Sequence, residues 1–268
     1  MRFFPFLFLF SLSATINDPF RCEWFTGYRN DRIHWHLQDA ATNTVTYSEL
    51  YRDVEFWENG LVFKVIHRDI VFFVRGSYSA FGKGQLQETQ AGIRQPRSHT
   101  TGWAADASGY LSYAVNLTNG RVYKWIFMPL VGYSGYFERL RAPPQNLRQS
   151  WYGVFLGAGL QIEPGGRLLF NLGYAYHWPH LHFTTHFLSS SEPTTNSFHT
   201  DQGGNLGQTG WAQVDYRFGK VWRVGLGAQV HYFSTPFSNV DTSQTPTSQT
   251  LKLRWVPIDG WMQISREL

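Results

Sequence analysis

The chain is poor in cysteine, in charge and in long apolar runs, and each shortage excludes a class of protein. Cys22 is the single cysteine among 268 residues, which excludes a disulfide framework and a cysteine-ligated metal cluster. Charged residues are 16% of the chain and the net charge is +4, with the basic residues scattered, which argues against nucleic acid as a partner. After residue 14, no stretch approaches the about 18 consecutive apolar residues of a membrane helix. Neither a glycine-rich phosphate loop nor a G-x-S-x-G motif is present, and no cofactor is predicted.

Aromatic residues, in contrast, are abundant. They make up 18% of the chain, as 11 Trp, 14 Tyr and 22 Phe, beside 25 Gly and a mean hydropathy of −0.31. A soluble core does not need so many rings, whereas the interface girdles of membrane proteins use them. A chain that is rich in rings yet hydrophilic on average fits β-strands with one apolar and one polar face.

The first residues have the features of an export signal. The segment 1–14 (MRFFPFLFLFSLSA) has a positive Arg2, an apolar run from Phe3 to Phe10 and a small-residue cleavage region. The alternative is a membrane anchor, but the run is shorter than the about 20 residues that a spanning helix needs. The sequence therefore predicts a signal peptide over 1–14 and a single β-barrel domain over 22–268.

A period of two runs through the remaining chain. In 221–233 (VWRVGLGAQVHYF) every even position is apolar, with a ring at each end, and the odd positions include polar residues and glycine. The segment 211–218 repeats the pattern, and Gly219 and Lys220 form a two-residue turn that joins antiparallel neighbours. Segments within 70–80, 152–162 and 168–178 alternate in the same way. A face with rings at both ends and aliphatic residues between them is typical of a lipid-facing strand.

The alternation assigns side chains to two faces. The apolar face carries a predicted aromatic girdle: Tyr174, Tyr176, Trp178, Tyr216, Phe218, Trp222 and Tyr232. The opposite face carries the predicted pore-lining residues: Arg75, Gln213, Asp215, Arg217, Arg223 and Gln229. Many glycines share the second face, which favours some open space in the lumen.

Ten strands are predicted, near 22–37, 44–65, 69–81, 105–116, 121–137, 149–162, 167–187, 208–218, 221–233 and 248–261. Long connections are expected at 82–104, 138–148, 188–207 and 234–247, and short turns between them. Short periplasmic turns and long external loops are the asymmetry of outer-membrane barrels. A soluble sandwich or a lipocalin-like barrel is the alternative, but strands of 10 to 13 residues match the about 9–11 that cross a bilayer better than the usual soluble length of about 5–6.

Three stretches resemble the omptin outer-membrane proteases: 48–84, 129–134 (PLVGYS) and 152–157. The chain also resembles the Protochlamydia outer membrane protein family of omptin-like barrels, some of which are regarded as porins. The resemblance implies a ten-stranded barrel. It does not carry the protease chemistry over, because the expected Asp-x-Asp pair is replaced by 85–90 (QLQETQ) and the Asp-x-His pair by 178–182 (WPHLH). Catalytic residues are therefore predicted to be absent, and the protein is not expected to be an enzyme.

Two weaker signals remain. His180 and His182 share one face of an extended segment and are weak candidates for a metal site, with interfacial histidines as the simpler interpretation. His34 and His36 form a second such pair. Basic residues in 82–104 and 138–148 make a rim if these loops are close, and such a rim attracts anionic surface polysaccharide or lipid headgroups, with solvated loop charges as the simpler interpretation.

The sequence thus predicts an all-β, antiparallel transmembrane β-barrel of about ten strands in the outer membrane of a Gram-negative-type bacterium. Its surroundings are the lipid bilayer, with lipopolysaccharide as a candidate partner. The expected function is structural or porin-like passive diffusion of small solutes, and a narrow pore and a closed barrel both remain open. An omptin-like surface hydrolase with altered catalytic groups and an adhesin acting through external loops are the alternatives.

Overall fold

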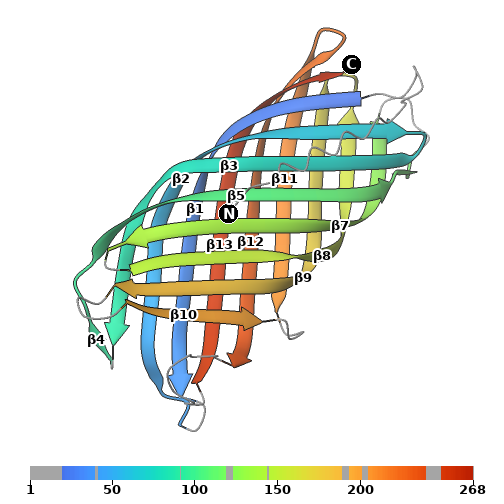
Figure 1. The fold of residues 1–268 in the computed structure, drawn as a ribbon. Helices are drawn as coiled ribbons and strands as arrows, with labels where there is room; N and C mark the ends of the chain where they lie inside the picture. Colours follow the sequence, from blue (N-terminus) through green and yellow to red (C-terminus); the bar gives the residue numbers. More distant parts are fainter. Residues whose placement is uncertain are drawn as a thin grey trace, which may run out of the picture.

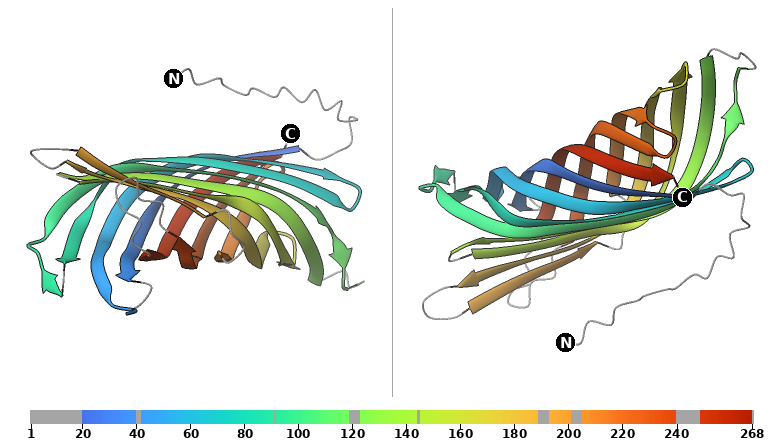
Figure 2. Two further views of the ribbon diagram at one scale, coloured as in Figure 1. Left: turned by 60° about the horizontal axis from the view of Figure 1, so that its bottom comes forward. Right: turned by 90° about the horizontal axis from the view of Figure 1, so that it is seen from above.

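Ten long strands form one closed antiparallel ring in the computed structural model (Figure 1), so the predicted barrel is confirmed. The structure describes residues 20–39, 42–90, 92–118, 123–143, 145–188, 193–200, 205–239 and 249–267. The ring follows the order β9, β11, β12, β13, β1, β2, β3, β5, β7, β8 and closes back on β9. Figure 2 shows the same ring from two other sides.

The ring strands are β1 (Phe20–Asp39), β2 (Val45–His67), β3 (Ile70–Gln90), β5 (Ser98–Tyr113), β7 (Tyr123–Ala142), β8 (Gln145–Pro164), β9 (Leu168–Leu188), β11 (Leu206–Phe218), β12 (Trp222–Asn239) and β13 (Gln249–Glu267). Three shorter strands extend hairpins at the ring: β4 (Ile93–Arg94) pairs with β3, β6 (Val115–Asn116) with β7, and β10 (Pro193–Thr200) with β9. The first and last strands pair along their whole length, with Arg21 opposite Glu267 and Asp39 opposite Gln249.

Side chains alternate between the lumen and the outside as the sequence predicts. On β12, for example, Leu226 is 57% exposed, whereas His231 on the other face is 3% exposed. Strands of about 20 residues tilted by about 40° reach about 50 Å, roughly twice the height of the apolar band that a membrane barrel presents to lipid. Only part of each strand can therefore lie in the bilayer.

The chemistry of the outer face shows which part that is. Exposed rings and aliphatic side chains cover the outer face from the end of the barrel that carries Phe20, Glu267 and the short turns. They reach up to a level marked by Tyr28, Trp57, Tyr78, Trp178 and Tyr232. Beyond that level the outward positions become basic and polar, including Arg32, Arg52, Lys83, Arg148 and Arg254. The apolar band faces lipid. The remainder of the barrel protrudes beyond this band, at the end opposite to Phe20 and Glu267.

Two of the predicted long loops are instead strand. β3 continues to Gln90 and β5 begins at Ser98, and β7 and β8 are separated by residues 143–144 alone. The sequence interpretation was wrong there because the outward side chains of the protruding part are polar, like those of a loop. The last strand likewise continues beyond residue 261 to Glu267, and Arg266 lies over the Trp222 ring, with the guanidinium carbon 5.6 Å from its centroid.

Bulges bend the protruding strands. Asp53 and Phe81 have positive φ angles of 50° and 58°, and the pairing of β2 with β3 shifts register beside Asp53 and that of β3 with β5 beside Phe81. Because side chains alternate between the two faces, each extra residue moves the side chains beyond it to the opposite face of the sheet. The pairing of β1 with β2 also shifts, between Asp31 and Ile33.

The predicted signal peptide, 1–14, lies outside the described residues. Cys22 is a free, partly buried thiol on the outer face of β1. Among the described residues there is no helix long and apolar enough to cross a membrane.

Candidate functional site: the barrel lumen

The protruding half of the lumen is filled by apolar side chains. Trp35 on β1 meets Phe183 on β9 with ring centroids 5.4 Å apart, and Trp151 on β8 stacks on Trp255 of β13 at 6.5 Å. The strands in each pair lie four positions apart around the ring, so these rings bridge the lumen. We call this cluster the lumen plug: Ile33, Trp35, Tyr51, Val54, Phe56, Leu86, Ala104, Tyr136, Leu140, Ala142, Leu147, Trp151, Leu181, Phe183, Phe233, Leu251, Leu253 and Trp255.

Polar groups at the outer end of the plug also cross the lumen. Gln145 Nε2 on β8 donates a hydrogen bond to Tyr47 Oη on β2 at 2.9 Å. Tyr47 in turn donates to Glu49 Oε1 at 2.6 Å, and Trp35 Nε1 donates to Glu49 Oε2 at 2.9 Å. Burial raises the pKa of Glu49 to about 7, although the hydrogen bonds from Tyr47 and Trp35 act in the opposite direction.

Two charged residues of β1 form a buried ion pair beneath the plug. Arg29 donates two hydrogen bonds to Asp31, at 2.7 and 2.6 Å, and lies 3.8 Å from Asp259. Trp255 Nε1 donates to Asp31 at 3.1 Å, and the Arg29 guanidinium lies over the rings of Phe56 and Trp255. Both charged side chains are almost fully buried, so each depends on the other for compensation.

A chain of hydrogen bonds runs along the inner wall from β7 to β13. Ser134 Oγ lies 3.1 Å from His177 Nδ1, and Thr209 Oγ1 lies 2.9 Å from His177 Nε2 and 2.7 Å from His231 Nδ1. His231 Nε2 faces Asp259 at 3.5 Å. One arrangement of the protons satisfies all four contacts: Ser134 and Thr209 donate to Nδ1 atoms, and each Nε2–H donates onward. The chain is therefore a fixed polar layer beneath the plug.

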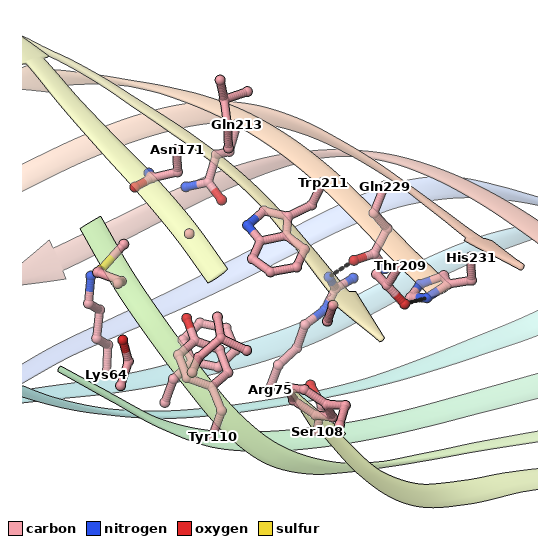
Figure 3. A pocket seen from close by; sticks show the side chains of 18 of the residues that line it. Lys64, Arg75, Ser108, Tyr110, Asn171, Thr209, Trp211, Gln213, Gln229 and His231 are labelled. Carbon is pink, nitrogen blue, oxygen red and sulfur yellow. Dashed lines mark hydrogen bonds between the residues drawn. The ribbon is translucent and has the colours of Figure 1, made fainter. Parts of the chain in front are cut away.

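A cavity of about 150 Å³ lies inside the membrane-spanning half of the lumen (Figure 3). In Figure 3, Lys64, Asn171 and Gln213 stand at one end of it, and Thr209 and His231 at the other. Arg75 lies between them: its guanidinium donates to Gln229 Oε1 at 3.0 Å, pairs with Glu58 at 3.3 Å and lies over the rings of Phe25 and Trp261.

Three inward glycines, unlike Gly159, which lines the cavity, do not open the lumen as the sequence leads us to expect. A Cβ atom at Gly227 would overlap the Trp261 ring, and one at Gly173 would overlap the Trp211 ring. Gly60 is covered in the same way by Phe25. These glycines make room for large lumen side chains.

All six predicted pore-lining residues lie on the inner face of their strands. Arg75, Gln213 and Gln229 line the cavity, and Asp215 is fully buried. Gln213 and Gln263 donate hydrogen bonds to the Asp215 carboxylate. Arg223 and Arg217 lie at the end near the short turns, and both pair with Glu267.

The predicted girdle residues lie on the outer face at two levels. Tyr216, Phe218 and Trp222 lie near the turn between β11 and β12, and Tyr174, Tyr176, Trp178 and Tyr232 lie near the protruding half. All are exposed except Tyr176, which is half-buried and packs edge-on against Trp178. Exposed aliphatic side chains occupy the outer face between these two levels.

The histidine pairs lie on the outer face, beyond the aromatic rings. His180 stacks on Tyr152, and His182 Nε2 lies 3.2 Å from Thr184 Oγ1. The rings of His34 and His36 are 5.6 Å apart. In the part of the chain that the structure describes, no three His, Cys, Asp or Glu side chains group as a metal site would require.

Sequence reasoning missed the groups at the centre of the lumen: Lys64, His177, Thr209, His231 and Asp259. Their inward orientation follows from the period of two. Their contacts depend on how β2, β9, β11, β12 and β13 are placed around the ring, which the pattern of a single sequence does not contain.

The fold is that of a known outer-membrane barrel. The crystal structure of the outer membrane protease OmpT from Escherichia coli matches with a TM-score of 0.70 and 7% identity, over 95% of this chain and 99% of that chain. The outer membrane protein OprG from Pseudomonas aeruginosa matches with a TM-score of 0.40 and 12% identity, over 94% and 95%. No curated protein sequence matches the chain. The protein is an outer-membrane β-barrel protein with an omptin-like fold.

Residues 131–255 match the family model described as Pom, Protochlamydia outer membrane protein. Both resemblances that the sequence motifs indicate are therefore confirmed, one by the family model and one by the fold.

Proposed function

We propose that the protein is a structural outer-membrane barrel whose lumen is closed to free diffusion, and that it binds anionic lipid of the outer leaflet. The observation that carries the first part is the set of contacts across the lumen: Trp35 with Phe183, Trp151 with Trp255, and the hydrogen bond from Gln145 to Tyr47. Small barrels fill their interiors with side chains in this way, whereas porins keep an aqueous channel.

A flux assay tests closure. We expect proteoliposomes that contain the folded protein to take up small sugars no faster than empty liposomes. Uptake that increases with the amount of protein would instead favour the porin-like function. That function is supported by the cavity in the membrane-spanning half, but it requires the plug rings to move.

The lipid-binding part rests on a basic patch above the aromatic level. Arg139 on β7 and Arg148 on β8 are directly opposite in register, and Arg141 is the next outward residue on β7. Like charges in cross-strand positions are unfavourable unless an anion compensates for them. The outward positions of the described part of these two strands carry no carboxylate in this stretch. Arginine binds phosphate oxygens through paired hydrogen bonds, so the phosphates of lipopolysaccharide fit the patch.

Binding of lipopolysaccharide to the purified barrel tests this. We expect the double variant Arg139→Gln with Arg148→Gln to bind at least about 100-fold more weakly, because two charged hydrogen bonds are lost and each contributes about 1.5–3 kcal/mol. The control Lys220→Gln removes one charge at the turn between β11 and β12, at the opposite end, and should bind normally. Equal binding by the double variant and the control would exclude the patch.

We also propose that the protein lacks omptin-type protease activity. The support is the absence of the paired acids at 85–90 and 178–182; Glu88 stands opposite another carboxylate, Glu49, with no histidine paired with it in the register. Cleavage of a reporter peptide that is lost in Glu88→Gln would support the hydrolase instead.

A further inference from the structure

The lumen cavity is reached from one end of the barrel. A second hollow at the ends of the strands is lined by residues of the short turns, among them Arg68 and Glu163. It shares Arg21, Lys64 and Met128 with the lumen cavity, so these side chains separate two adjoining hollows at that end. At the other end the cavity stops at the hydrogen-bonded layer and the plug. Access to the cavity is therefore expected from the side of the short turns, the periplasmic side, by movement of these long side chains.

The walls of this pocket are largely apolar and aromatic. Tyr110 stacks on Phe73 with ring centroids 4.5 Å apart, and Trp211, Phe155 and Leu130 complete the walls. A cavity of about 150 Å³ lined by apolar side chains is large enough for benzene. The space therefore fits an apolar body of about the size of one ring.

Lys64 is the cation of the pocket that has no contact partner. Arg21 pairs with Glu23 at 2.6 Å, Arg75 pairs with Glu58 at 3.3 Å, and Arg223 pairs with Glu267. Among the described residues, no carboxylate oxygen lies within 4.0 Å of Lys64 Nζ and no hydrogen bond is made by it. Glu23 and Asp215 act on Lys64 at longer range, and both are already bound by Arg21. Lys64 is partly buried, and an ammonium group that is partly withdrawn from water without a partner favours a bound anion.

We propose that the lumen cavity binds a small monocarboxylate with a ring-sized apolar body, with Lys64 holding the carboxylate and Tyr110, Trp211 and Phe155 enclosing the body. The anion enters from the periplasmic end, where Arg21 and Arg223 add positive charge beside Lys64. This site is independent of the closed plug and of the lipid-binding patch, because it lies inside the membrane-spanning half.

Calorimetric titration of benzoate into the refolded full chain in detergent tests the proposal. We expect saturable binding of one benzoate per chain. Benzyl alcohol lacks the charge and acetate lacks the ring, so both should bind at least about tenfold more weakly. Lys64→Met should weaken benzoate binding by at least about tenfold, whereas Lys220→Met, in a turn outside the pocket, should leave it unchanged.

A second variant keeps Lys64 and fills the space. Gly159 lines the cavity, and a Cβ atom there would contact Met128 at an ordinary distance of 3.4 Å, so the leucine of Gly159→Leu can be accommodated and would occupy the pocket. We expect it to abolish benzoate binding. Circular dichroism and the mobility of the unheated protein in gels confirm that each variant is folded. Absence of saturable benzoate binding by the wild-type protein overturns the proposal, and so does unchanged affinity in folded Lys64→Met or in Gly159→Leu.

Discussion

The buried pair of Arg29 and Asp31 gives the most quantitative prediction for stability. Arg29→Met would remove both hydrogen bonds to Asp31 and leave that carboxylate with the single donor Trp255 Nε1 at 3.1 Å. Two unit charges about 4 Å apart at an effective dielectric constant of about 20 attract each other by about 4 kcal/mol. Breaking a buried pair from one side costs about 3–5 kcal/mol, since the remaining charge is uncompensated. We therefore expect Arg29→Met to lower the free energy of unfolding by about 3–5 kcal/mol.

Equilibrium urea unfolding in liposomes, followed by tryptophan fluorescence, measures this change. The double variant Arg29→Met with Asp31→Leu should recover part of the loss, because the Asp31 carboxylate is then no longer left alone, whereas Asp259 still lacks its contact with Arg29. Arg32→Met is the matched control: Arg32 lies on the same strand but is exposed on the outer face, so its effect should stay within about 0.5 kcal/mol. A loss below about 1 kcal/mol for Arg29→Met, or a double variant as unstable as the single one, would refute the reasoning.

Three further predictions concern the plug, the pH response and the lumen glycines. Trp151→Ala should destabilise the barrel by about 3–5 kcal/mol in the same unfolding assay, and a loss below about 1 kcal/mol would mean that the plug is loosely packed. Because the folded-state pKa of Glu49 is raised to about 7, the folded state holds a proton that the unfolded state releases at about pH 4.5. Stability should fall as the pH rises from about 4.5 to about 7, and Glu49→Gln should remove that part of the dependence; an unchanged pH profile would contradict it. Gly227→Ala should cost about 1–3 kcal/mol because its methyl group meets the Trp261 ring. Gly210→Ala should be tolerated, because its Cβ would meet Val230 Cγ1 at an ordinary contact distance of 4.0 Å. Equal effects of the two substitutions would contradict the packing of the Trp261 ring over Gly227.

The strand directions and the two faces of each strand could be predicted from the sequence, and the closed lumen could not. β13 shows the reason. In its first part the apolar residues Leu251, Leu253 and Trp255 point into the lumen, whereas further along Ile258 and Met262 point outward. The apolar face changes sides without a change of register, because the strand passes from water, where apolar residues fill the interior, into lipid, where they cover the exterior. A period of two alone does not say which face is the inner one.

The contacts inside the lumen needed the three-dimensional arrangement. Arg75 and Gln229 are both predicted to face inward. Their hydrogen bond joins β3 to β12, and the two residues are 154 positions apart in the chain. The loops at 82–104 and 138–148 were predicted from polar composition, and that composition belongs to the outer face of strands that stand in water.

Single-channel recording of the refolded protein in a planar bilayer distinguishes a closed barrel from a pore. We expect insertion with no conductance steps. A variant with Trp35, Trp151 and Phe183 all changed to alanine should conduct, because it lacks the rings that bridge the lumen. Discrete ohmic steps from the wild-type protein, changed in ion selectivity by Arg75→Gln, would contradict closure and make the barrel a porin.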